Sequence, residues 1–144
     1  KRFMYEEIVP LMKEIVPLNP LGTVWSLLGD SLGATISLMT ALDYPDVFQR
    51  VIMQSPYVDD NVTTFIEQFD RLTKPEIYHT YGLKELDVPT TKMGRLNFLE
   101  PNEQLVTLLQ DKFTNYEYEV NPEGNHTWKY WQQELPHIIA KMFI

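Results

Sequence analysis

The stretch VWSLLGDSLGATISLMTALDYP, residues 24–45, restricts the possible folds more than any other part of the sequence. The segment 23–29 is short, continuous and apolar, which is typical of a buried strand. Residues 31–43 carry apolar side chains at helical spacing, with small residues that permit close packing on a sheet. Between the two lies GDSLG, residues 29–33, so a serine stands between two glycines where a strand should pass into a helix.

A Gly-x-Ser-x-Gly motif in this context predicts the sharp turn known as a nucleophile elbow. The turn lifts the Oγ of Ser31 clear of the sheet, and we expect the glycines at 29 and 33 because bulk at either position would clash with neighbouring backbone. The N-terminus of the following helix offers free N–H groups and a partial positive charge. We therefore expect the N–H of Leu32 to stabilise an oxyanion formed on an attacked carbonyl. The alternative is a glycine-tolerant turn without chemistry.

The rest of the chain also alternates strands and helices. We expect further strands at 50–56, 76–82 and 115–120, helices at 3–16, 62–72, 100–113 and 127–143, and a long loop at 83–98. Pro10 should kink the first helix or lie near its start, and Pro136 should break or bend the last. This order predicts an α/β fold, a parallel sheet of about four strands with helices on both faces. Without a repeat or linker, residues 1–144 are expected to form a single domain.

A serine hydroxyl is a poor nucleophile until a base removes its proton, and three histidines are candidates for that base. His126 lies in a loop after the last strand and before the last helix, as expected for a base that follows the serine and the acid in chain order. His79 lies within a strand, where packing or hydrogen bonding is the better explanation, and His137 is expected on the surface. The three histidines do not have metal-ligand spacing, so we expect no metal site.

A carboxylate should orient the base and stabilise its charged form. It is expected just after the strand that precedes the His126 strand, where YGLKELD offers Glu85 and Asp87. We prefer Glu85, three residues after Gly82, and keep Asp87 as the alternative. The pair at 59–60 is a third and weaker choice.

The composition excludes several classes of partner. A net charge of −8 argues against nucleic acid and against an anionic membrane surface as partners.

The chain has no cysteine, which excludes disulfides and thiolate chemistry and is typical of a reducing compartment, so we expect a cytoplasmic location. No apolar run is long enough to cross a bilayer. No phosphate-binding glycine loop or dinucleotide fingerprint is present, and we expect no cofactor.

Four segments of the chain resemble the putative-esterase family of α/β-hydrolases, which includes enterochelin-esterase-like proteins, S-formylglutathione hydrolase and the mycolyltransferases. They are GDSLGATISLMTALDYPDVFQRVIMQSP, YHTYGLKE, FLEPNEQLVTLL and EGNHTWKYWQQELP, and together they cover nearly the whole chain. The last is the most telling, because family members often close with a Gly-x-His loop, a Trp-x-x-Trp-like helix and Leu-Pro. The resemblance implies Ser31 as nucleophile, His126 as base and an acid at 85–87.

The resemblance also implies that this chain corresponds to the C-terminal half of such a protein. Family members carry earlier strands and a loop that donates the second oxyanion N–H. We therefore expect the strand 23–29 to present an unpaired edge and this chain alone to be weakly active or inactive. A second copy of the chain or a complementing N-terminal half could cover that edge, and a monomer at high concentration would count against the homodimer.

The leading functional hypothesis is a serine hydrolase that cleaves carboxylic esters through an acyl-enzyme, with a small-molecule ester as substrate. An acyltransferase of the same fold is one alternative, and a non-catalytic fragment that serves interaction or assembly is another. For substrate binding we name Tyr57 and Asp30, because loops after the strands usually build the pocket. Tyr57 could equally be a core residue.

Overall fold

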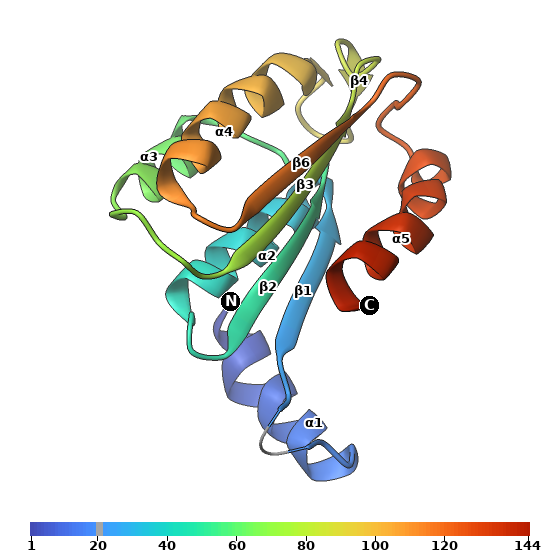
Figure 1. The fold of residues 1–144 in the computed structure, drawn as a ribbon. Coiled ribbons are helices and arrows are strands. Elements are labelled where there is room, and N and C mark those ends of the chain that lie inside the picture. Colours follow the sequence, from blue (N-terminus) through green and yellow to red (C-terminus); the bar gives the residue numbers. More distant parts are fainter. Residues whose placement is uncertain (20–21) are drawn as a thin grey trace.

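The computed structural model of the protein describes residues 1–19 and 22–144. Its centre is a four-stranded parallel sheet in the order β1-β2-β3-β6, shown in Figure 1. The strands are β1 (Trp25–Asp30), β2 (Phe48–Gln54), β3 (Glu76–Gly82) and β6 (Tyr116–Asn121). The predicted parallel α/β sheet is confirmed, with each strand within two residues of its expected bounds.

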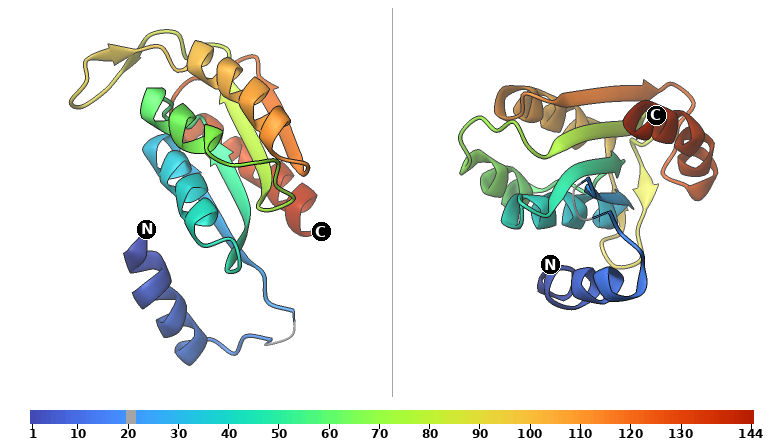
Figure 2. Two further views of the ribbon diagram at one scale, coloured as in Figure 1. Left: turned by 90° about the vertical axis from the view of Figure 1, so that its left-hand side faces the viewer. Right: turned by 60° about the horizontal axis from the view of Figure 1, so that its bottom comes forward.

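Helices cover both faces of this sheet, as the alternation of elements predicts. The helices α2 (Ser31–Asp43), α3 (Asp60–Glu67) and α4 (Leu99–Lys112) lie on one face, and α5 (Trp128–Phe143) lies on the other (Figures 1 and 2). Alternate side chains of the strands point to opposite faces. Val51, Met53 and Ile77 join the core beneath the three helices, whereas Ile52 and Tyr78 pack with Ile138 and Met142 of α5. The last helix continues through Pro136.

The N-terminal helix consists of a π-helical turn (Met4–Ile8) followed by α1 (Val9–Ile15). Pro10 lies at the start of α1, which directly follows the π-helical turn. The Tyr5 ring stacks on Tyr44 at 4.3 Å between centroids, and Val9 is buried in the core that α2 shares. These contacts attach the helix to the three-helix side of the sheet.

Two predicted segments, the helix 62–72 and the loop 83–98, differ from the structure. The helix expected at 62–72 begins earlier, because the Asp59 carboxylate caps α3 by accepting from the N–H of Val62 at 3.0 Å. It also ends at Glu67, and Leu72 instead forms an isolated bridge with Phe113. The expected loop at 83–98 contains a short antiparallel hairpin of β4 (Val88–Pro89) and β5 (Arg95–Leu96), because Gly94 adopts a φ of +67° at its turn.

Both outer strands of the sheet are edges within the described residues, since β1 pairs only with β2 and β6 only with β3. Beside the β1 edge, Leu28 on the strand and Leu32 and Ile36 on α2 are exposed. Pairing of this edge with a second copy or with another part of the protein stays a prediction.

The two glycines of the motif have different roles. A Cβ on Gly29 would lie 2.4 Å from the carbonyl carbon and oxygen of Gly33, so only glycine fits where β1 passes beneath the start of α2. A Cβ on Gly33 would meet nothing within 4 Å. The expectation that bulk at both positions would clash is therefore wrong for Gly33, because that face of α2 is open in this chain.

These two positions provide a matched stability test. We expect Gly29→Ala to lower the free energy of unfolding by about 1–3 kcal/mol, because backbone atoms must move to admit the methyl group. Gly33→Ala should raise it by roughly 0.5–1 kcal/mol, because alanine loses less entropy than glycine within a helix. Urea unfolding followed by circular dichroism measures both values. Equal destabilisation by the two variants would contradict this account.

His79 is a core residue, as its position within a strand predicts. Its ring is fully buried, with Nδ1 2.8 Å from the Tyr116 hydroxyl and Nε2 2.7 Å from Oδ1 of Asn102. The Asn102 amide in turn donates to the carbonyls of Pro56 and Phe98 at 3.0 and 2.8 Å. Burial lowers the pKa of His79 to about 4, although the hydrogen bond with Asn102 opposes the shift.

This lowered pKa makes the fold sensitive to acid. Between pH 6.5 and about 4 the unfolded chain binds a proton at His79 that the folded chain does not, so stability falls as pH falls. We expect His79 to account for a loss of about 2 kcal/mol in unfolding free energy between pH 7 and pH 5. Urea titrations of wild type and His79→Gln at both pH values measure it. The same pH slope in both proteins would refute the assignment to His79.

Candidate active site

Ser31 occupies the strained turn between β1 and α2. Its φ is +50°, in the left-handed region that non-glycine residues seldom adopt, and it is the first residue of α2. Tyr57 secures the turn from the neighbouring strand end, since its N–H donates to the Ser31 carbonyl at 3.1 Å. Leu32 follows as the second helical residue, and amides of a first helical turn have no intrahelical acceptor. Ser31 thus stands in a strained turn between a strand and a helix, and the assignment of this turn as a nucleophile elbow stays a prediction.

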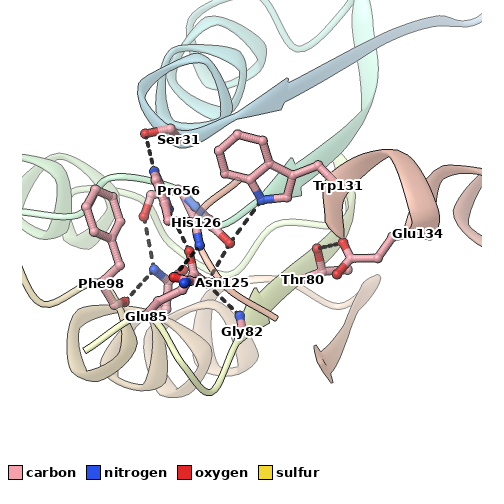
Figure 3. A network of polar contacts seen from close by, with 12 residues as sticks. Ser31, Pro56, Thr80, Gly82, Glu85, Phe98, Asn125, His126, Trp131 and Glu134 are labelled. Carbon is pink, nitrogen blue, oxygen red and sulfur yellow. Dashed lines mark hydrogen bonds and ion pairs between the residues drawn. The ribbon is translucent and has the colours of Figure 1, made fainter. Parts of the chain in front are cut away.

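His126 joins Ser31 to Glu85, as Figure 3 shows. The Ser31 Oγ lies 2.9 Å from Nε2 of His126, and Oε1 of Glu85 lies 2.6 Å from Nδ1. An ionised carboxylate can only accept, so Nδ1 carries the proton and Nε2 is left to accept from the Ser31 hydroxyl. A hydroxyl beside such an imidazole can lose its proton as it attacks a carbonyl.

Glu85 is completely buried, and its carboxylate has three hydrogen-bond partners among the described residues. Besides His126 at Oε1, its Oε2 accepts from the Ser55 hydroxyl at 2.8 Å and from the Gly82 N–H at 2.6 Å. Three donors compensate for taking a carboxylate out of water. The carboxylate is therefore held next to the imidazole of His126.

The other carboxylates considered from the sequence do not reach His126. Asp87 is exposed and accepts from the Arg95 guanidinium at 2.8 Å, an interaction that lowers its pKa. Asp59 caps α3, and Asp60 begins that helix. His137 is exposed as expected and contacts Glu119 at 3.0 Å.

The loop that carries His126 is fastened to the end of β3. The Lys84 N–H donates to the Gly124 carbonyl at 3.0 Å, and a Cβ on Gly82 would lie 2.2 Å from that same oxygen. Only glycine at position 82 permits this approach. The Asn125 Oδ1 then accepts from the His126 N–H at 2.8 Å, which fixes the backbone beside the ring.

Two aromatic side chains enclose the imidazole of His126. The Phe98 ring lies 4.0 Å from it, tilted by 35°, and the Trp131 ring meets it edge-on at 4.9 Å. Figure 3 shows them on opposite sides of His126. They leave the His126 side chain only 11% exposed and restrict rotation of the ring.

Asp30 adds a second carboxyl group near the imidazole. Burial raises the pKa of Asp30, and the positive charge of a protonated His126 partly offsets that rise. Asp30 ends β1 but its side chain does not cap α2. Its part in substrate binding stays a prediction.

Tyr57 lines a small cavity beside this array. The cavity has a volume of about 200 Å³, and its lining is Tyr57, Val58, Leu96, Asn97, Phe98 and Pro101. The Tyr57 and Phe98 rings meet edge-on at 6.3 Å, so the cavity shares Phe98 with the surroundings of His126. The role of Tyr57 in substrate binding stays a prediction, and the cavity that Tyr57 lines is the space that this role concerns.

Sequence reasoning missed three contributors to this arrangement: Ser55, Phe98 and the direct contact of Trp131 with His126. Ser55 could have been found, because it directly follows β2 and the carboxyl ends of parallel strands meet at one edge of the sheet. No sequence signal identifies Phe98, which enters from the segment before α4. Within residues 1–19 and 22–144, no group of three His, Cys, Asp or Glu side chains could hold a metal ion, and no helix could span a bilayer.

One known protein is similar in sequence to almost the whole chain. The "Uncharacterized protein YjcH" of Bacillus subtilis (strain 168) is 46% identical over 142 residues, which are 99% of this chain and 59% of that protein. This chain therefore spans only part of that relative's length.

Solved structures share the fold at lower identity. The enterobactin esterase FES of Shigella flexneri is 18% identical with a TM-score of 0.74, over 97% of this chain and 38% of FES. The siderophore hydrolase EstB of Aspergillus nidulans is 17% identical with a TM-score of 0.76, over 97% of this chain and 55% of EstB. The S-formylglutathione hydrolase FrmB of Staphylococcus aureus is 17% identical with a TM-score of 0.72, over 97% of this chain and 60% of FrmB.

Residues 1–142 match the protein family described as "Putative esterase". With almost the whole chain matched, and with a parallel sheet and helices like those of these esterases, this protein belongs to that family.

Proposed function

We propose that this chain carries the catalytic centre of a serine hydrolase that cleaves carboxylic esters. The observation that carries the proposal is the continuous array from Ser31 Oγ through His126 to the buried Glu85 carboxylate, at 2.9 and 2.6 Å. Membership of an esterase family supports it, as does the likeness of the fold to esterase structures.

In the first half of the reaction, Ser31 Oγ attacks the ester carbonyl while Nε2 of His126 takes the hydroxyl proton. The N–H of Leu32 stabilises the resulting oxyanion, with help from the positive end of α2. Glu85 keeps the ring oriented and stabilises its charged form. His126 then gives the proton to the departing alkoxide, which leaves as the alcohol, and the acyl group remains on Ser31 Oγ as an ester.

In the second half, water replaces the alcohol. His126 takes a proton from the water as its oxygen attacks the acyl carbonyl, and then returns a proton to Ser31 Oγ as the carboxylic acid leaves. This cycle needs no cofactor.

A covalent probe tests the nucleophile. We expect a fluorophosphonate to phosphonylate Ser31 in the protein at the full length that its gene encodes, because the array activates that hydroxyl. Intact-mass spectrometry with peptide mapping locates the label. The Ser31→Ala variant should gain no mass. A folded wild-type protein that stays unlabelled would overturn the proposal.

A pair of carboxylate variants tests the acid. We expect Glu85→Gln to reduce kcat for a p-nitrophenyl ester by about 10²–10⁴-fold, because the amide cannot accept from all three donors and His126 loses its orientation. Asp87→Asn, a matched change two residues away in an exposed position, should stay within about twofold of wild type. Initial-rate measurements at pH 8 provide both values. A larger loss from Asp87→Asn than from Glu85→Gln would show that the acid is wrongly assigned.

A further inference from the structure

Two serines share an unusual backbone conformation in this chain. Within the described residues, the non-glycine residues with positive φ are Ser31, at 50°, and Ser55, at 47°. They follow β1 and β2, which are neighbours in the sheet, and both contact the His126–Glu85 pair. Strained backbone of this kind costs free energy and is concentrated at functional sites. The strain at Ser31 has an explanation in the elbow, whereas that at Ser55 does not.

The contacts of Ser55 determine where its proton goes. Its side chain is buried and its N–H donates to the Thr80 carbonyl at 2.7 Å. The indole Nε1–H of Trp131, which can only donate, lies 3.4 Å from Ser55 Oγ, and Oε2 of Glu85 lies 2.8 Å from it. A hydroxyl has one proton, so Ser55 accepts from Trp131 and donates to Glu85.

We propose that Ser55 is a positioning residue that orients the Glu85 carboxylate toward His126, with the Trp131 indole directing the Ser55 proton. The inference rests on the proposed function, since it concerns the acid of that site. Without the Ser55 hydroxyl, the Gly82 N–H would be the one remaining hydrogen-bond donor at Oε2 among the described contacts. The Ser55 hydroxyl supplies a second donor at the same oxygen, and Oε1 is thereby held in line with Nδ1 of His126.

A purely structural role would make a different prediction. If Ser55 only joined the ends of β2 and β3, then any loss of activity on substitution would follow the loss of stability. If Ser55 positions Glu85, activity falls in every variant that lacks the hydroxyl group, whatever the stability of that variant.

Two variants at this position separate stability from the hydroxyl. Ser55→Gly and Ser55→Ala both remove the hydroxyl, but glycine adopts the left-handed conformation without strain and alanine does not. We expect Ser55→Gly to melt at a higher temperature than Ser55→Ala. Ser26→Ala is the control, because it removes a serine hydroxyl from β1 that has no hydrogen-bond partner in the described part of the chain.

The first measurement does not depend on catalysis. In proton NMR of the full-length protein at low temperature, the Nδ1–H of His126 should give a far-downfield resonance, assigned by its absence in His126→Asn. We expect this resonance to move upfield and exchange faster with water in both Ser55 variants, and to be unchanged in Ser26→Ala. A wild-type resonance in Ser55→Gly would overturn the inference.

The second measurement is the rate of fluorophosphonate labelling at Ser31. We expect both Ser55 variants to react about 10–100-fold more slowly than wild type, the factor that corresponds to loss of one hydrogen bond to a charged group. Equal loss in the two, despite different melting temperatures, supports positioning. A Ser55→Gly rate within twofold of wild type refutes it. If wild type itself is not labelled, the proposed function fails, and the NMR comparison still decides whether Ser55 orients Glu85.

Discussion

The buried Glu85 carboxylate is the interaction on which the rest of the site depends. A carboxylate in a protein interior is tolerated only when donors surround it. Glu85 has three at its side chain, and its backbone carbonyl accepts from Phe98 and Leu99 at 2.8 and 3.1 Å, where α4 begins. One residue therefore connects the ends of β2 and β3, the His126 loop and the start of α4. Removing its side-chain charge would weaken the first three connections, whereas the backbone carbonyl would keep its contacts with α4.

Two close backbone approaches, each at a glycine, bring the polar groups of the site together. Gly29 lets β1 pass against the first turn of α2, and Gly82 lets β3 pass against the loop at Gly124. Each brings a polar group to the carboxyl edge of the sheet: Ser31 in the first case and His126 in the second. Aromatic rings of Phe98 and Trp131 then enclose the imidazole, so the hydrogen bonds form in a place where water competes little.

The β1 side of the molecule contrasts with this well-satisfied centre. Gly33 has open space beside it, and Leu28, Leu32 and Ile36 are exposed along the same region. Proteins that share this fold are longer than the chain, which spans 59% of its Bacillus relative and 38–60% of the esterases compared above. Ser31 thus lies beside the outer strand β1 of the described structure, whereas Glu85 is completely buried within it.

The sequence by itself determined the order and type of the main elements, because hydrophobic runs and helical spacing are local properties. It also identified Ser31 and His126, which stand in motifs that require particular neighbours. It favoured Glu85 over Asp87 but kept Asp87 as an alternative, because the two lie two residues apart in one loop and only the folded chain shows which is buried against donors and which pairs with Arg95. The ends of α3, the β4–β5 hairpin and the contributions of Ser55 and Phe98 were likewise decided by tertiary contacts. Such contacts join segments that are distant in the chain, and no local pattern records them.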